Sequence, residues 1–295
     1  MAAATHRELR LDEHRLVYDE YGSGPRTLVL LHGLLLSRRM HAPLAGALAE
    51  RGNRVLCLDL LGHGDSDRPV DMWRYSMPGF GEQVVALLDH AGVDEAVVGG
   101  TSLGANVALE VAVQAPERLR GLIVEMPVLD NALLACALAF TPLLVGLTVG
   151  ERAARLLSRA ARAVPRERWP LVDVPLDALR QDPGPSAAVL QGLFFGRIAP
   201  PGSERKGIAS PTLVLGHPRD PVHPFSDADM LVRELPHVRL VRASSLLELR
   251  VSPDRLTAEI ADFVDDCWRP AAASGPRPAA GSARGRRGRA RRASA

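Results

Sequence analysis

Lysine is the scarcest residue in this sequence, and cysteine is also rare. Only Cys57, Cys136 and Cys267 occur in 295 residues, so no disulfide framework holds the chain together, and a reducing cytoplasm is the predicted setting. No cysteine–histidine spacing is typical of a metal site, so no metal is predicted. Lys206 is the only lysine, which excludes a phosphate-binding loop of the G-x-x-x-x-G-K-[ST] kind, and no cofactor is expected.

Aromatic residues are also few, at 4%, whereas 46% hydrophobic and 24% charged residues are ordinary values for a globular chain. The positive charge is almost entirely arginine. Seven arginines and no acid lie in residues 270–295, and removing them from the net charge of +2 leaves −5 for residues 1–269. The tail 270–295 is built from Ala, Arg, Gly, Pro and Ser, which predicts disorder. It has no aromatic side chain to stack on bases, so no nucleic-acid partner is expected.

Long apolar segments are nearly absent. The first twenty residues lack the apolar core of a secretory signal. One uncharged segment, residues 131–150, has the length of a membrane-spanning helix, but Pro142 and Gly146 interrupt it. We expect this segment to be buried or to line a pocket rather than to span a membrane. The sequence leaves the oligomeric state open.

Short apolar runs alternate with amphipathic segments along most of the chain. Alternating polarity over residues 7–21 predicts a hairpin. Six apolar runs predict buried strands, at 27–31, 54–58, 96–98, 121–124, 211–215 and 238–241. Helical spacing is present at 37–51, 107–113 and 253–268. The pattern predicts an α/β fold, with a mostly parallel twisted sheet covered by helices on both faces.

The alternation stops between residues 127 and 210, where the chain is helical or irregular and no strand is predicted. This stretch is interpreted as an insertion between two parallel strands. The chain is therefore divided into a first core segment (1–126), a helical insertion (127–210), a second core segment (211–269) and a tail (270–295).

The most specific motif is Gly100-Thr101-Ser102-Leu103-Gly104, a G-x-S-x-G sequence between a buried strand and a helix. This context is the one that a nucleophile elbow requires, because small residues must flank a tight, strained turn. The turn places Ser102 at the carboxyl end of the sheet. The N–H of Leu103 then points into the same space from a helix N-terminus. Ser102 is the predicted nucleophile, with Gly100 and Gly104 as the glycines that permit the turn.

Two further motifs accompany the elbow. His32-Gly33-Leu34 follows the strand 27–31, and the segment 59–67, DLLGHGDSD, follows the strand 54–58. Together the three motifs resemble the α/β-hydrolase fold superfamily over about residues 7–268. The resemblance implies a hydrolase core in the two core segments, a lid in 127–210, and an oxyanion hole formed by the backbone N–H groups of Leu34 and Leu103. Serine at the elbow differs from the family's dehalogenases and epoxide hydrolases, which use Asp there.

The resemblance also implies an acid and a histidine. The acid belongs after the strand 211–215, where Asp220 stands. The histidine belongs in the loop after the last strand, here 242–249, and this loop has none. After Asp220 only His223 and His237 remain, and His237 precedes the last strand at the wrong end of the sheet.

Three hypotheses remain open for the base. His223 could serve from a relocated position, oriented by Asp220 or by Glu125, which ends the strand 121–124. Another group such as Glu248 could activate Ser102. Alternatively the base is lost, and Ser102 is then a poor nucleophile near neutral pH.

The resemblance and the apolar side chains of the insertion predict a cytoplasmic serine esterase. It would cleave a carboxylic ester or related acyl bond of an apolar small molecule through an acyl-enzyme on Ser102. The alternative is a catalytically impaired ligand-binding or receptor-like protein on the same fold.

Overall fold

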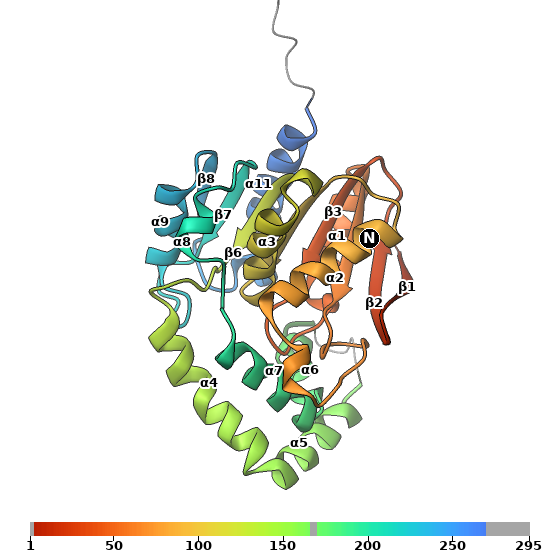
Figure 1. The fold of residues 1–295 in the computed structure, drawn as a ribbon. Coiled ribbons are helices and arrows are strands. Elements are labelled where there is room, and N and C mark those ends of the chain that lie inside the picture. The colour runs from red at the N-terminus through yellow and green to blue at the C-terminus, as the bar shows by residue number, and fades with distance from the viewer. Residues whose placement is uncertain (1–2, 166–169, 270–295) are drawn as a thin grey trace, which may run out of the picture.

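The computed structural model describes residues 3–165 and 170–269, and one eight-stranded sheet organises them (Figure 1). The strands are β1 (Ala4–Leu11), β2 (His14–Tyr21), β3 (Arg26–Leu31), β4 (Asn53–Asp59), β5 (Ala96–Thr101), β6 (Leu119–Glu125), β7 (Thr212–Gly216) and β8 (Val238–Arg242). Their order is β1-β2-β4-β3-β5-β6-β7-β8. The hairpin β1–β2 joins β4 in antiparallel fashion, and every other neighbouring pair is parallel. The predicted α/β class, the hairpin and the six strands are confirmed.

Both faces of the central strands are covered, which explains their continuous apolar runs. Successive residues of β3, such as Val29 and Leu30, belong to different core clusters because successive side chains point to opposite faces. The helices that contribute to the first cluster are α2 (Met77–His90), α3 (Leu103–Gln114), α7 (Pro183–Phe195) and α9 (Phe225–Glu234). Those that contribute to the second are α1 (Ala42–Glu50), α10 (Glu248–Val251) and α11 (Asp254–Cys267). The short 3₁₀ helices are η1 (Arg38–His41), η2 (Met72–Arg74) and η3 (Pro116–Arg118).

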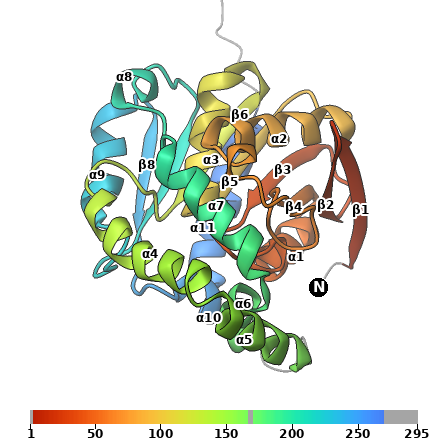
Figure 2. The same ribbon diagram turned by 60° about the horizontal axis from the view of Figure 1, so that its bottom comes forward.

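The insertion between β6 and β7 is helical. It comprises α4 (Leu133–Thr148), α5 (Glu151–Ala163), α6 (Pro170–Arg180), α7 (Pro183–Phe195) and α8 (Gly202–Arg205). In Figures 1 and 2, α4 and α5 form an outer arm below one end of the sheet, and α7 lies between this arm and the core. Asp227 of α9 anchors the start of the arm, because its buried carboxylate accepts hydrogen bonds from the backbone N–H groups of Leu129, Asn131 and Ala132.

The uncharged segment 131–150 differs from its predicted burial. Leu133, Cys136, Ala137 and Phe140 line a pocket, as expected, but Cys136 is the one buried residue of α4. No single described helix is long and apolar enough to cross a membrane; α4 and α5 meet the criterion only as a pair, and this pair is bent by 95°. The sequence pattern could not predict that α4 is exposed, because a helix that is apolar on all sides has the same pattern in a protein core and on a surface. The tail 270–295, predicted to be disordered, lies outside the described residues.

A buried carboxylate fixes the loops at the carboxyl end of β4. Asp59 is fully buried and accepts hydrogen bonds from the backbone N–H groups of Arg38 (2.6 Å) and Asp65 (2.8 Å). The Arg38 guanidinium, also buried, pairs with Asp59 and reaches Asp65 at 3.0 Å. Gly64 is required here, because a Cβ at this position would lie 1.8 Å from an Asp59 oxygen. The ion pair therefore holds the 59–67 loop against the segment that follows β3.

Replacing Arg38 by alanine is expected to leave Asp59 buried without its counter-ion. We expect Arg38→Ala to lower the free energy of unfolding by about 3–5 kcal/mol, measured by urea denaturation at pH 7.5. The matched control is Arg39→Ala, because Arg39 pairs with the same Asp65 from a side chain that is 38% exposed. A surface pair contributes about 0–1 kcal/mol. Equal losses in the two variants would contradict the assignment.

Candidate active site

The elbow forms as the sequence requires. Ser102 joins β5 to α3 with φ +54° and ψ −109°, a strained conformation for a residue with a side chain. Its backbone N–H donates to the carbonyl oxygen of Glu125 at 2.9 Å. A Cβ on Gly104 would lie 2.2 Å from the Leu31 carbonyl oxygen, and one on Gly100 would lie 2.5 Å from the backbone of Gly104. Only glycine at these two positions lets α3 pack this closely against β3 and β5.

Three of the predicted site residues meet at the elbow. Ser102 Oγ lies 2.8 Å from His223 Nε2, and His223 Nδ1 lies 2.8 Å from Asp220 Oδ2. An ionised carboxylate can only accept, so Nδ1 carries the imidazole proton and Nε2 is free to accept the Ser102 hydroxyl proton. The Asp220 side chain is 2% exposed and that of His223 is 16% exposed. A continuous serine–histidine–carboxylate chain therefore exists without a histidine after β8.

The acid and the histidine lie in one short loop after β7. Asp220 Oδ1 also accepts the backbone N–H groups of Val222 (2.9 Å) and His223 (3.0 Å), so the carboxylate fixes the loop as well as the imidazole. Burial opposes ionisation of Asp220, but the hydrogen bonds from the His223 ring and backbone outweigh it and lower the pKa of this carboxyl. The carboxylate stays charged at neutral pH, as an orienting acid requires.

Glu248, named as an alternative base, is engaged elsewhere. Its carboxylate accepts hydrogen bonds from the backbone N–H and hydroxyl of Ser244 and from the Arg255 guanidinium. The bond from Arg255 is the main cause that lowers the pKa of Glu248 to about 2. A carboxylate with so low a pKa is a weak proton acceptor near neutral pH.

Glu125, the alternative acid, is the centre of a second buried network beside the elbow. The Thr101 hydroxyl donates to its carboxylate, Arg250 Nη2 lies 2.9 Å from Oε2, and His217 Nε2 lies 3.4 Å from Oε1. Arg250 also donates to Thr101 Oγ1 at 3.0 Å. Burial would raise the pKa of Glu125, but Arg250 and His217 hold it well below its usual range. Burial opposes charging of His217, yet Glu125 raises its pKa. This network fixes Thr101, the residue before Ser102.

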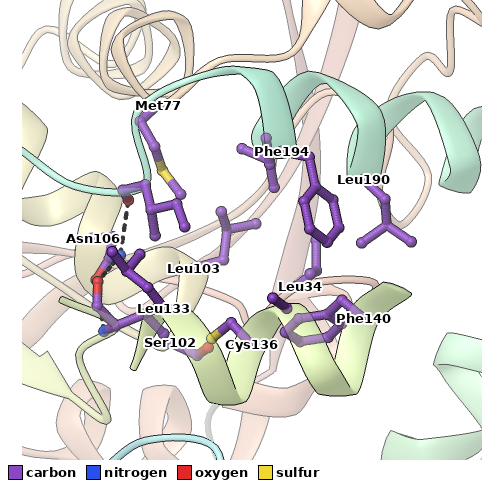
Figure 3. A pocket seen from close by; sticks show the side chains of 14 residues that line it. Leu34, Met77, Ser102, Leu103, Asn106, Leu133, Cys136, Phe140, Leu190 and Phe194 are labelled. Atoms are coloured by element: carbon purple, nitrogen blue, oxygen red, sulfur yellow. Dashed lines mark hydrogen bonds between the residues drawn. The ribbon is translucent and has the colours of Figure 1, made fainter. Parts of the chain in front are cut away.

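An apolar cavity of about 180 Å³ opens beside Ser102 (Figure 3). Leu34 and Leu103, the predicted oxyanion-hole residues, both line it. The Leu103 N–H begins α3, where unpaired backbone donors and the helix dipole favour a developing negative charge. Leu34 sits in a turn closed by a hydrogen bond from the Leu36 N–H to the Gly33 carbonyl oxygen at 3.1 Å. The remaining lining residues are Met77, Asn106, Val128, Leu133, Cys136, Ala137, Phe140, Leu190, Leu193, Phe194 and Ile198.

Asn106 ties the core to the insertion. Its amide Nδ2 donates to the carbonyl oxygens of Val128 (2.7 Å) and Ile198 (2.8 Å), and its Oδ1 accepts the Val128 N–H at 3.1 Å. One buried side chain on α3 thus holds the chain before α4 and the chain after α7 at the cavity wall. Within the described residues, no group of three or more His, Cys, Asp or Glu side chains is arranged to hold a metal ion.

The fold and the elbow motif are those of the α/β-hydrolase family. A model of the alpha/beta hydrolase fold matches residues 26–244, so the chain belongs to that family, as the resemblance predicted. Bifunctional epoxide hydrolase 2 of Mus musculus is 38% identical over 109 residues, which are 36% of this chain and 19% of that protein. The 2-hydroxymuconate semialdehyde hydrolase of Pseudomonas putida is 32% identical over 118 residues, 40% of this chain and 41% of the relative. The chain thus spans less than half the length of these curated relatives.

Solved structures show the same fold over a larger share of the chain. The enol-lactonase from Burkholderia xenovorans LB400 has a TM-score of 0.72 and 22% identity, covering 88% of this chain and 100% of that one. A thermophilic esterase from Thermogutta terrifontis has a TM-score of 0.68 and 21% identity, covering 90% and 99%. At this level of identity the likeness establishes the fold alone.

Sequence reasoning missed three residues that the structure brings to the site. Asn106, His217 and Arg250 come from three different elements, and no motif marks them. Arg250 is one of 35 arginines, so its residue type carried no signal. His217 directly follows β7, and its position at the carboxyl end of a strand was the one available indication.

Arg250→Ala is expected to destabilise the fold in a pH-dependent way. In the wild type the pKa of Glu125 lies below the unfolded value of about 4.3, so its stabilising contribution is complete above that pH. Without Arg250, burial raises this pKa, and the carboxylate then destabilises the fold at every pH above the unfolded value. We expect a loss of about 3–5 kcal/mol in unfolding free energy at pH 8 and a smaller loss at pH 5, by urea denaturation.

The control for this experiment is Arg239→Ala, which breaks an exposed ion pair with Glu259. Its cost should stay within about 1 kcal/mol at both pH values. A loss in Arg250→Ala that does not change between pH 8 and pH 5 would argue against Glu125 as the titrating group.

Proposed function

We propose that this protein is a serine hydrolase that cleaves a carboxylic ester or related acyl bond of an apolar small molecule. The observation that carries the proposal is the pair of 2.8 Å contacts that joins Ser102 to His223 and His223 to Asp220. Distances of this size allow proton transfer from the nucleophile without rearrangement.

The proposed reaction follows from the positions of these groups. Ser102 Oγ attacks the acyl carbon as its proton passes to His223 Nε2, and Asp220 stabilises the imidazolium that forms. The N–H groups of Leu34 and Leu103 hold the oxyanion of the tetrahedral intermediate. The imidazolium then protonates the leaving alcohol, and an acyl-enzyme remains on Ser102. Water attacks the acyl-enzyme, gives its proton to His223, and releases the carboxylic acid with Ser102 restored.

The cavity supports an uncharged substrate of modest size. Apart from Ser102, Asn106 and Cys136, all residues that line it are apolar. Burial raises the pKa of the Cys136 thiol to about 11, so this side chain is neutral as well. The cavity volume of about 180 Å³ is close to that of an apolar cavity of about 150 Å³, engineered in another protein, that binds benzene. This size favours a short acyl chain or a single ring. In this proposal the insertion 127–210 acts as the lid that excludes water.

The free thiols favour a reducing compartment. Cys57, Cys136 and Cys267 are all unpaired, and Cys57 and Cys136 are buried. We therefore place the protein in the cytoplasm.

Active-site labelling tests the proposal directly. A fluorophosphonate probe should label the wild type and should not label Ser102→Ala. In His223→Ala the labelling rate should fall by about 10³-fold or more, because the serine loses its base. His237→Ala is the matched control, since His237 is exposed and precedes β8 at the other end of the sheet, and its labelling should equal that of the wild type. An unlabelled wild type would instead favour a ligand-binding protein without a competent base.

A second experiment tests the cavity as the acyl site. Phe140→Ala removes an aromatic ring from the cavity wall, so the preferred p-nitrophenyl ester should become longer by two or more carbons. We expect kcat/KM for the longer ester to rise relative to acetate by about tenfold, since each buried methylene is worth about 0.8 kcal/mol. Phe195→Ala changes an exposed ring that does not line the cavity and should leave the profile unchanged. A profile that shifts equally in both variants would place the acyl group elsewhere.

A further inference from the structure

The outer arm of the insertion exposes an apolar stripe. Residues 131–150 contain no charged side chain, yet Leu134, Leu138 and Val149 of this segment are 72%, 69% and 86% exposed. With Val145 they are spaced four, seven and four residues apart, so on α4 and the residue after it they lie along one side of the helix. Cys136 points the opposite way, into the cavity. A stripe of this length on a water-exposed surface indicates a surface that meets an apolar phase or partner.

The next helix continues the stripe and adds positive charge. In α5, Leu156 and Leu157 are both about two-thirds exposed. Arg152 and Arg159, also exposed, lie one turn to either side of Leu156, on the flank of the apolar residues. Glu151 is the one acid of α5 and is paired with Arg155. The arm is therefore amphipathic and basic, in contrast to residues 1–269 as a whole, which carry −5.

The stripe is continuous with the mouth of the cavity. Leu133 of α4 and Phe194 of α7 line the cavity and are also 46% and 41% exposed. Leu133 is adjacent to Leu134, the first residue of the stripe. In Figure 2, which brings the bottom of the molecule forward, α4 and α5 extend across the front next to α7. Leu133 and Phe194 therefore provide apolar contacts between the exposed stripe and the cavity beside Ser102.

We propose that the stripe on α4 and α5 is a docking surface for an anionic lipid bilayer. The 95° bend between the helices prevents the pair from crossing the bilayer as one rod, so both lie in the interface with their leucines and valines among the acyl chains. Arg152 and Arg159 then reach the headgroups, where their long side chains bring the guanidinium groups to anionic phosphates. Docking places the cavity mouth at the membrane surface.

Charge decides between a bilayer and a second copy of this chain. In a twofold dimer through the same stripe, both copies would bring the same basic surface to the interface, because the two contacting patches are identical. Glu151, the one acid of α5, is already paired with Arg155 and leaves Arg152 and Arg159 without a counter-charge from this helix. The resulting like-charge contacts oppose association. Anionic headgroups supply the opposite charge instead, so the bilayer is the occupant that matches both the apolar and the basic parts of the surface.

Vesicle flotation tests the proposal with the full chain. The wild type should bind vesicles of phosphatidylglycerol and phosphatidylcholine in equal parts, and the binding should weaken at least fivefold without phosphatidylglycerol or at 0.5 M NaCl. The double variant Leu138→Gln, Val149→Gln should bind at least tenfold less, and Arg152→Gln, Arg159→Gln several-fold less. Val232→Gln, which changes an exposed valine of α9, is the matched control and should bind like the wild type.

Further measurements separate membrane docking from misfolding, from the proposed hydrolase activity and from self-association. Thermal unfolding of each variant should match the wild type, because only exposed side chains are changed. Ser102→Ala should bind vesicles as the wild type does, so docking and the proposed hydrolase activity can fail separately. Undiminished binding of Leu138→Gln, Val149→Gln would overturn the proposal and assign any binding to the arginines of 270–295. A wild-type dimer that this variant converts to a monomer, without vesicle binding, would overturn it in favour of self-association.

Discussion

The strained turn at Ser102 is the constraint on which the site depends. A positive φ at a residue with a side chain persists only where the surroundings hold it. Here the glycines on either side let α3 press against the backbone of β3, and the Glu125 carbonyl accepts the Ser102 N–H. The central parallel strands and their helices therefore act as a rigid frame that presents one hydroxyl at the carboxyl edge of the sheet.

Two buried carboxylates beside this frame, Asp220 and Glu125, have different roles because they have different partners. Asp220 accepts hydrogen bonds from the His223 imidazole and from two backbone N–H groups, so it holds the His223 ring toward Ser102. Glu125 contacts Arg250, His217 and Thr101, so its carboxylate holds the elbow against the segment after β8. Where the family's histidine would stand, Ser244 and Glu248 are joined by a hydrogen bond, and the imidazole beside Ser102 comes from the loop after β7 instead.

The insertion has an inner surface that lines the cavity and an outer surface that is exposed. Its inner side lines an apolar cavity, and Asn106 and Asp227 fasten its ends to the core through buried hydrogen bonds. Its outer side exposes leucines and valines beside arginines, a combination that water alone does not favour. The uncharged segment 131–150 was expected to be buried or to line a pocket. Its helix α4 does line the cavity on one side, but its other side is exposed.

The sequence by itself determined the sheet, the elbow and the position of the insertion, because strand periodicity and glycine-bracketed turns are local properties. It also named Ser102, Asp220 and His223 as candidates. Only the tertiary structure decided that His223 lies within hydrogen-bonding distance of Ser102, and that Glu125 pairs with Arg250, 125 residues away. Such contacts depend on how distant loops meet at one edge of the sheet, which residue spacing along the chain does not encode.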